Sequence, residues 1–413
     1  MNRFRSGWRA LCGGLLIALT AAAAVEARVQ IDFWNLFTGG DGDIMREIVQ
    51  QFNEAQDDVE VVMTILPWGD PYYSKLLTAT IAGAPPQVAV VHASRMLPYV
   101  SQGLLMEFTP AILAQNGLRA ADFFQTPWRA GQYRGRQYAI PLDIHPYALY
   151  FNTDHFAQAG LSDHGPANGE ELVLAARKLT LKGSDGRVSR WGYGWAGARE
   201  WFGAIFQFGG RLLEEGGTEV GFLDGSGQRA IEYYARLIEA VGGAFGGDFA
   251  QQTLSMMQLG PWEIGRMERA GVPFRTVPMP QIGPQGNAVW TDSHLLAIPA
   301  PVASGERAKL DAALTFIRWL TENAHLWSAG AGHVPTLRRV IASDAFRKLE
   351  HQLAFANSLA FARYYPQVGK STELESAIHE AVWSAWNKQV APGPALEGLA
   401  ERIEQLVAED RRS

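Results

Sequence analysis

Two runs of the sequence each carry an aspartate and a histidine two positions apart inside an apolar, strand-like segment. They read AIPLDIHPYALYFN and WTDSHLLAIP. Side chains alternate between the two faces of a strand, so Asp143 and His145 share one face of the first run, and Asp292 and His294 share one face of the second. Each run therefore presents a carboxylate and an imidazole side by side.

Three kinds of chemistry fit such pairs. They could bind the hydroxyl groups of a solute, because a carboxylate accepts hydrogen bonds and a neutral imidazole donates or accepts them. They could form a satisfied structural network, or they could bind zinc. The spacing matches no zinc motif and no cysteine supports one, so we expect neither a metal site nor a cofactor.

The alternative to a protein that only binds a solute is a periplasmic glycoside hydrolase or lyase. Asp143 and Asp292 could flank a glycosidic bond, since such enzymes use two carboxylates, one with a raised pKa. The adjacent histidines favour the ionised carboxylates, and the sequence has no nucleophile elbow, zinc-protease helix or cysteine nucleophile. We expect a protein that is not an enzyme and has no catalytic residues.

Several aromatic residues stand at strand ends or breaks, where a core residue is less expected. A pyranose has apolar faces and a polar rim, so a sugar site needs flat aromatic platforms with orienting polar groups. The candidates are Trp34, Trp68 and Trp262, together with Trp201 at the start of an apolar helix and Tyr364 in a helix break before Pro366. For each, a purely structural role in the core or in a turn stays open.

Polar residues at the ends of the first and third expected strands complete the candidate set. Asn35 ends the first strand, and Asp41 lies in the turn FTGGDG before a helix, where free N–H groups could bind a hydroxyl or only cap the helix. His92 and Ser94 follow the third strand. His333 lies in the break AGAGHVPT.

Composition and the N-terminus restrict the class of protein. The 413 residues are 47% hydrophobic and 19% charged, which suits two globular domains. Residues 1–27 place three arginines before an alanine-rich apolar run, as a secretory signal peptide does. Its removal would change the net charge from −6 to −8, because it holds three arginines and one glutamate. This charge argues against nucleic acid, and we expect a soluble, exported, periplasmic protein.

The order of elements indicates an α/β fold. Strand, helix, strand, helix and strand follow one another from residue 29 to residue 91, which predicts a parallel sheet with right-handed crossovers. Ligands bind beyond the carboxyl ends of such strands. A second α/β unit begins after residue 151, with helices expected at 169–179, 200–208 and 228–240, and one long amphipathic helix is expected at 308–328.

Seven motifs follow one another along the chain: IDFWNLFTGGDG, LLTATIAGAPPQVAVVHAS, YAIPLDIHPYALYFN, LGPWEIG, WTDSHLLAIP, AGHVPT and APGPALEGLAERIEQLV. In this order they resemble the motifs of the extracellular solute-binding proteins of carbohydrate ABC importers, the maltose-binding-protein-like family. The resemblance covers nearly the whole chain after the signal, with Pro86-Gln87 in place of the family's common Pro-Asp. No run matches one sugar subfamily well enough to name the sugar.

The resemblance implies a two-lobe periplasmic-binding-protein fold of type II, each lobe a mostly parallel sheet flanked by helices. It places the N-terminal lobe at 28–141 and 293–330, the C-terminal lobe at 142–292 and 337–413, and hinges near 141–145, 289–293 and 331–336. A sugar would lie in the cleft, and the closed protein, expected to be a monomer, would deliver it to a membrane permease that has a separate ATPase. A polyol, polyamine, amino acid or metal ion remains as an alternative solute.

Overall fold

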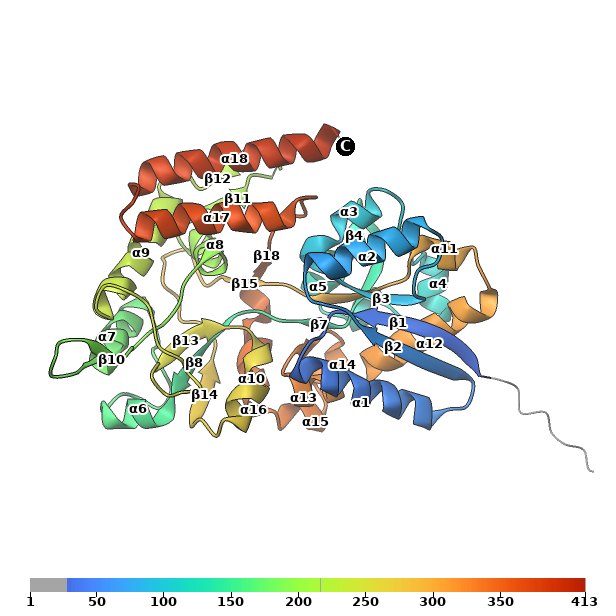
Figure 1. Cartoon of the computed structure of the whole chain (residues 1–413), viewed down its shortest axis with the longest axis horizontal. Coiled ribbons are helices and arrows are strands. Elements are labelled where there is room, and N and C mark those ends of the chain that lie inside the picture. The colour runs from blue at the N-terminus through green and yellow to red at the C-terminus, as the bar shows by residue number, and fades with distance from the viewer. Residues whose placement is uncertain (1–27, 216, 413) are drawn as a thin grey trace, which may run out of the picture.

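The computed structural model describes residues 28–215 and 217–412, so the predicted signal peptide lies outside the described residues. The first lobe is built on a five-stranded sheet in the order β2-β1-β3-β16-β6 (Figure 1). β1 (Val29–Asn35) pairs in parallel with β2 (Val59–Ile65) and β3 (Val88–His92). β16 (His294–Ala297) comes from much later in the chain and pairs antiparallel with β3 and with β6 (Ala139–Pro141).

Helices cover this sheet because their apolar residues recur at helical spacing. α1 (Gly40–Ala55) buries Met45, Ile48, Val49 and Phe52 and packs on β2, and α12 (Arg307–Glu322) packs on β1. α2 (Asp70–Ile81) follows β2. The core of this lobe also includes residues that lie C-terminal to α12, among them Leu337 and Val340.

The single long helix expected at 308–328 is divided in the structure. α12 ends at Glu322, and α13 (Ala324–Ala331) begins two positions later, after the single residue Asn323. Asn323 between them has φ −103° and ψ 17°, outside the helical region, which suits asparagine because its side chain competes for backbone hydrogen bonds. The side chain donates to the Trp319 carbonyl at 2.8 Å.

The second lobe is built on a three-stranded sheet in which β8 (Ala148–Asn152) is central and buried throughout. β13 (Met256–Leu259) and β14 (Phe274–Val277) flank it, and both are antiparallel to β8. This corrects the expected mostly parallel sheet for this lobe. The chain passes from β13 to β14 through α10 (Ile264–Arg269), a crossover that lets these two strands run the same way.

Five helices form most of the second lobe's core. They are α7 (Gly169–Leu179), α8 (Ala198–Gln207), α9 (Ser226–Ala240), α17 (Ser371–Trp386) and α18 (Pro392–Arg412). α17 and α18 lie side by side along the outer edge of this lobe (Figure 1). α7 has the bounds that the sequence predicts.

Several segments cross between the lobes. β7 (Asp143–Ile144) pairs antiparallel with β17 (Val334–Pro335), and β15 (Val289–Thr291) pairs in parallel with β18 (Ala362–Tyr364). β7, β15 and β18 lie in the middle of the molecule, between the two lobes (Figure 1). The two-lobed α/β architecture agrees with the expected fold, while the lobe boundaries predicted above stay a prediction.

Short elements complete the described chain. The helices are α3 (Leu97–Val100), α4 (Pro110–Gln115), α5 (Gln125–Ala130), α6 (Thr153–Gln158), α11 (Ala300–Ala303), α14 (Arg338–Ile341), α15 (Asp344–Arg347) and α16 (Glu350–Asn357), with 3-10 turns η1 (Ala93–Arg95), η2 (Ala120–Asp122), η3 (Pro261–Glu263) and η4 (Ser358–Phe361). The strands are β4 (Gln132–Tyr133), β5 (Arg136–Gln137), β9 (Leu181–Lys182), β10 (Val188–Arg190), β11 (Arg211–Leu213) and β12 (Val220–Gly221). Within the described ranges, none of the helices combines the length and the apolar character needed to span a membrane.

Candidate functional site

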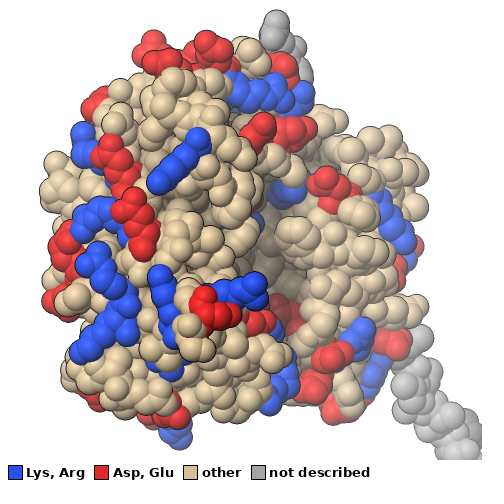
Figure 2. Space-filling model, turned by 60° about the vertical axis from the view of Figure 1, so that its left-hand side comes forward, with Lys and Arg blue, Asp and Glu red and all other residues tan. Residues whose placement is uncertain are grey.

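A cavity of about 560 Å³ lies between the lobes, a size usual for small-molecule sites. Figure 2 shows a hollow between the two halves of the molecule, with acidic and basic side chains near its rim. The polar and aromatic residues that line the cavity are Phe37, Thr38, Asp41, Trp68, Tyr73, His92, Ser94, Arg95, His145, Arg199, Trp262, Glu263, Arg266, Arg269, Trp290, Asp292, His294, His333, Tyr365 and Glu375.

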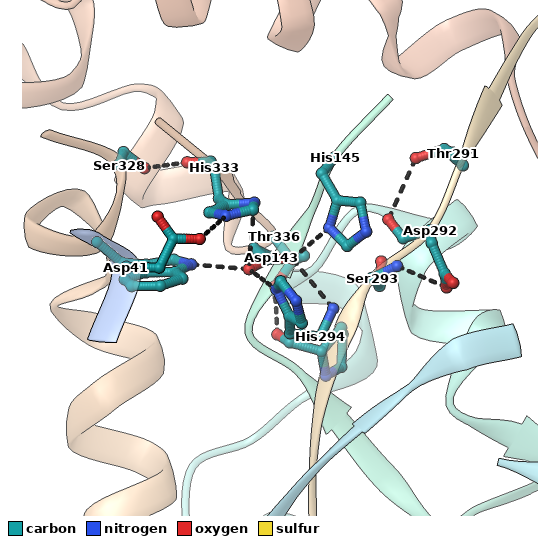
Figure 3. Close-up of polar contacts among 12 residues, drawn as sticks. Asp41, Asp143, His145, Thr291, Asp292, Ser293, His294, Ser328, His333 and Thr336 are labelled. Carbon is teal, nitrogen blue, oxygen red and sulfur yellow. Dashed lines mark hydrogen bonds and ion pairs between the residues drawn. The ribbon is translucent and has the colours of Figure 1, made fainter. Parts of the chain in front are cut away.

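Asp143 on β7 is the centre of a buried polar cluster at the floor of this cavity (Figure 3). Its Oδ1 accepts hydrogen bonds from Nδ1 of His145 and the backbone N–H of His294, both at 3.1 Å. Its Oδ2 accepts from Nδ1 of His294 and Nε1 of Trp327, both at 2.7 Å. Burial alone would raise the pKa of Asp143, but the charges of His294 and His333 and the imidazole hydrogen bonds hold it well below its usual range.

His333, just before β17, joins this cluster from the third crossing segment. Its Nε2 lies 3.3 Å from Oδ2 of Asp41, while its Nδ1 lies 3.8 Å from Oδ2 of Asp143 and has no hydrogen-bond partner. The ring stacks on the indole of Trp327, with centroids 5.0 Å apart and planes 3° apart. Burial lowers the pKa of His333, but Asp143 and Asp41 outweigh it and raise the pKa.

Two further imidazoles stay neutral at pH 7. Burial lowers the pKa of His145 to about 3 and that of His92 well below its usual range. The strand register places His92 opposite His294, with ring centroids 4.7 Å apart, and Nδ1 of His92 shares a hydrogen bond with the Tyr73 hydroxyl at 2.7 Å. Each of these neutral rings has one nitrogen engaged by the protein, which leaves the other for a solute.

Asp292 links the second motif to the first lobe. Its Oδ2 accepts from the Ser94 hydroxyl at 2.5 Å, and its Oδ1 accepts from the backbone N–H groups of Ser293 at 2.8 Å and Ser94 at 3.2 Å. Burial raises the pKa of Asp292, and these hydrogen bonds oppose the rise. Asp292 therefore both orders Ser94 and borders the cavity.

Aromatic rings from both lobes face the cavity. Trp262 follows the turn Gly260-Pro261, and a Cβ placed on Gly260 would lie 2.0 Å from the indole Cζ3, so the glycine is what allows the indole to lie there. Trp290 is buried on β15, and the Arg199 guanidinium lies 4.2 Å from its ring centroid. Trp68, before α2, is 60% exposed although it borders the cavity.

The charged residues around the cavity are largely paired. Nε of Arg199 on α8 donates to Oε1 of Glu375 on α17 at 2.6 Å. Arg266 on α10 donates to Oε2 of Glu263 at 3.0 Å and Oδ2 of Asp248 at 3.1 Å. Arg95 pairs with Asp70 at 3.1 Å. Most of the positive charge is thus neutralised before any solute arrives.

The structure brings nine of the fourteen predicted site residues to this cavity. They are Asp41, Trp68, His92, Ser94, His145, Trp262, Asp292, His294 and His333. Asp143 lies directly beneath, fully buried, and orients His145 and His294 without lining the cavity. Their roles in solute binding remain a prediction.

The remaining four predicted residues do not line the cavity. Asn35 is buried, and its side-chain oxygen accepts from the Phe37 N–H at 3.1 Å, so it orders the turn after β1. Trp34 packs against the core of the first lobe, with the Lys75 ammonium 5.2 Å from its ring centroid. Both residues come shortly before lining residues in the sequence, but their own side chains stabilise the fold and do not border the cavity.

Trp201 and Tyr364 have structural positions as well. Trp201 is fully buried in α8 and donates from Nε1 to the Gly227 carbonyl at 3.1 Å, as expected for a tryptophan in a helical apolar stripe. The Tyr364 hydroxyl bonds the Ser293 hydroxyl at 2.5 Å, and its ring packs against the cores. Its neighbour Tyr365 lines the cavity instead, since adjacent side chains point opposite ways at the end of β18.

Sequence reasoning missed several residues of the lining. Trp290 had a signal, because it precedes Asp292 and His294 by two and four positions in the same strand-like run. Arg199 and Glu375 had none, since they stand 176 positions apart and meet only where α8 packs on α17. Tyr73 lies on a helix whose apolar pattern indicates only a core position.

The chain matches known proteins over most of its length. Residues 38–325 match the family model described as bacterial extracellular solute-binding protein. A putative binding protein of Brucella abortus is 22% identical over an alignment of 427 positions that covers 97% of this chain and 98% of that protein. The solved sugar-binding protein MalE of Xanthomonas citri has a TM-score of 0.80 at 18% identity, with 93% and 98% of the chains covered. UgpB of Mycobacterium tuberculosis, solved with glycerophosphocholine, has a TM-score of 0.79 at 20% identity, with 93% and 99% covered.

The protein belongs to the family of bacterial extracellular solute-binding proteins. It is therefore a solute-binding component of an ABC importer with the two-lobe type II fold, and it is not an enzyme. This confirms the predicted family and excludes the hydrolase alternative.

Proposed function

We propose that this protein captures a carbohydrate, a mono- or oligosaccharide, in the interlobe cavity. The observation that carries the proposal is the composition of the lining: tryptophans from both lobes, Trp68 and Trp262, with neutral imidazoles and carboxylates between them. Indole faces match the apolar faces of a pyranose, and the polar groups match its hydroxyl rim.

The charge balance supports an uncharged solute. The lining contains four arginines, Arg95, Arg199, Arg266 and Arg269, and four carboxylates, Asp41, Glu263, Asp292 and Glu375. Three of these arginines are already in ion pairs. An anionic solute would have to displace those carboxylates, whereas a hydroxyl-rich solute can accept from the guanidinium groups and donate to the carboxylates with the pairs in place.

Closure of the lobes would complete the site. The cavity floor is formed by the crossing segments that hold Asp143, Asp292 and His333, so a change in lobe angle moves Trp68 and Trp262 relative to each other and leaves the floor in place. The closed form would then dock on a membrane permease that works with a separate ATPase. We further propose that the protein acts in the periplasm as a monomer after removal of residues 1–27.

One other solute class has a specific observation in its favour. The cavity has four arginines, and UgpB of Mycobacterium tuberculosis was solved with a glycerophosphodiester, so a phosphate-containing solute is the second candidate. A polyol would use the same contacts as a sugar, and a polyamine would need more unpaired carboxylates than the lining provides.

A thermal-shift screen tests the proposal. A solute that binds only the native state stabilises it by about 2.7 kcal/mol at a hundredfold excess over Kd. The panel holds mono-, di- and trisaccharides, polyols, polyamines, amino acids, glycerophosphocholine and inorganic phosphate. We expect a rise in Tm with a carbohydrate. A rise only with glycerophosphocholine or phosphate would establish the second candidate and end the first.

A further inference from the structure

We propose that Asp143, His145, His294 and His333 bind a divalent transition-metal ion, with zinc as the best match, which ties the three crossing segments together. One ligand atom of each residue lies within 4.8 Å of the ligand atoms of the others, and all four residues are buried. Three imidazole nitrogens and one carboxylate oxygen are a donor set that zinc takes in tetrahedral geometry.

The distances fit four ligands around one ion. Zinc bonds of about 2.0–2.2 Å to nitrogen and oxygen place tetrahedral ligand atoms about 3.4 Å apart. Oδ2 of Asp143 lies 2.7 Å from Nδ1 of His294 and 3.8 Å from Nδ1 of His333, and Oδ1 lies 3.1 Å from Nδ1 of His145. These separations bracket the tetrahedral value, but the four ligand atoms lie only within 4.8 Å of one another, so the side chains would have to move closer together to bind one ion.

The orientation of His333 is the independent observation that points to a cation. Its Nε2 faces the Asp41 carboxylate at 3.3 Å and must carry a hydrogen to donate there (Figure 3). In the neutral ring Nδ1 then has a lone pair, and this buried, unpartnered nitrogen faces Oδ2 of Asp143. Two acceptors that face each other in a buried site repel one another, and a cation between them would remove that repulsion.

A proton on Nδ1 of His333 is the competing source of that charge. The 3.8 Å separation exceeds the 2.7–3.2 Å of an N–H···O hydrogen bond, yet two zinc bonds can span it. Nδ1 of His145 and Nδ1 of His294 would each have to release the hydrogen that they now direct at Asp143 in order to bind the ion. Asp41 would then act on His333 as a carboxylate that orients a metal-binding imidazole.

The position of the cluster gives the ion a role. Asp143 and His145 belong to the first crossing segment, His294 begins β16 where the second crossing segment joins the first-lobe sheet, and His333 directly precedes β17 in the third. A bound ion would fix the three segments at one point beneath the cavity, and lobe movement would take place around it. This role is separate from the identity of the transported solute.

The test uses the protein without a polyhistidine tag, stripped with a chelator. Zn²⁺ is titrated by calorimetry, and Co²⁺ is followed by its visible d–d absorption, which reports tetrahedral ligation. We expect one equivalent of Zn²⁺ and a tetrahedral Co²⁺ spectrum. His333→Asn should weaken Zn²⁺ binding by at least about tenfold. His164→Asn removes an exposed histidine that is not part of the cluster and should change neither result.

Three results would overturn the proposal. The first is a wild-type protein that binds no Zn²⁺. The second is equal Zn²⁺ affinity in wild type and in folded His333→Asn, with folding checked by circular dichroism. The third is an octahedral Co²⁺ spectrum in the wild type, and this measurement decides even where His333→Asn does not fold. Sugar binding in the stripped protein is measured in parallel, so a failure here leaves the carbohydrate proposal standing.

Discussion

At the scale of single residues, the cavity depends on side chains held by unusual neighbours. Trp262 lies over a glycine whose missing Cβ leaves room for the indole. Asp143 is buried, yet it stays ionised because nitrogen donors surround it. The position of the Trp262 indole and the ionised state of Asp143 each depend on neighbouring residues. In each case one of these neighbours could be substituted without removing a group that would contact the solute.

The pair Gly260 and Trp262 leads to a prediction about solute affinity. Trp262→Ala should weaken binding of the carbohydrate found in the screen by about tenfold or more, roughly 1.4 kcal/mol, because it removes a stacking platform. Gly260→Ala should weaken it in the same direction, because its Cβ would displace the indole. Isothermal calorimetry gives both values.

A matched control makes that result interpretable. Trp383→Ala removes another tryptophan of the second lobe, which is 37% exposed and does not line the cavity, and it should leave affinity unchanged. If Trp262→Ala binds as tightly as wild type while remaining folded, Trp262 does not contact the solute. If only Gly260→Ala has no effect, the indole can move without loss.

At the scale of elements, the start of α8 holds a carboxyl group in an environment that resists ionisation. The Glu200 side chain accepts from the Gly197 N–H at 2.7 Å, where the helix has unpaired N–H groups. Burial nevertheless raises the pKa of Glu200 to about 7, with a further rise from Glu375 and opposing effects from the hydrogen bonds and Arg199. The helix start is thus most stable when Glu200 is protonated.

This shift predicts a pH-dependent stability. The folded-state pKa lies above the ordinary value of 4.5, so the favourable contribution is fully present below pH 4.5 and is lost as pH rises through 7. The loss amounts to about 3 kcal/mol. Glu200→Gln keeps an acceptor for Gly197 but cannot ionise, so it should match wild type at pH 4.5 and be more stable than wild type at pH 8.

Urea unfolding at several pH values measures this difference. Glu171→Gln is the control, since Glu171 occupies the same position in α7, three residues after the N-cap Asn168, but its side chain is exposed. The difference between Glu200→Gln and wild type should grow with pH, and that for Glu171→Gln should not. If the difference in unfolding free energy between Glu200→Gln and wild type does not change with pH, burial does not perturb the titration of Glu200.

Helices and strands could be predicted from the sequence where the residue pattern within the element itself indicates them. The sequence predicted a strand that starts at residue 29 and ends at Asn35, as β1 does, and it predicted α7 over 169–179. The paired Asp-x-His motifs led to the cavity because the register of β16 against β3 brings His294 to His92. Arg199 and Glu375 stayed hidden, since their pairing depends on the packing of two distant helices.

At the scale of the whole molecule, the two lobes meet at a floor made from the crossing segments. The cavity above that floor is lined from both sides. Because a solute held there would contact both lobes, we expect its binding to be coupled to the angle between them. Trp68 is largely exposed at the rim of the first lobe, which leaves apolar surface available for burial on closure.

The coupling predicts a change of shape that solution scattering detects. Adding the solute identified in the screen should lower the radius of gyration, since closure brings the lobes together. Trp262→Ala, measured at the same solute concentration, should show a smaller decrease. A radius of gyration that does not change at saturating solute would rule out lobe closure as the response.

The place of β16 in the first sheet also has a consequence for how the chain folds. β16 separates β3 from β6, so until residues 294–297 are available the edge of β3 has unpaired backbone groups and β6 has no sheet to join. A nascent chain that ends within the second lobe, before β16, therefore has an incomplete first-lobe sheet. Folding must wait for most of the polypeptide, and truncated products should be prone to aggregation and degradation.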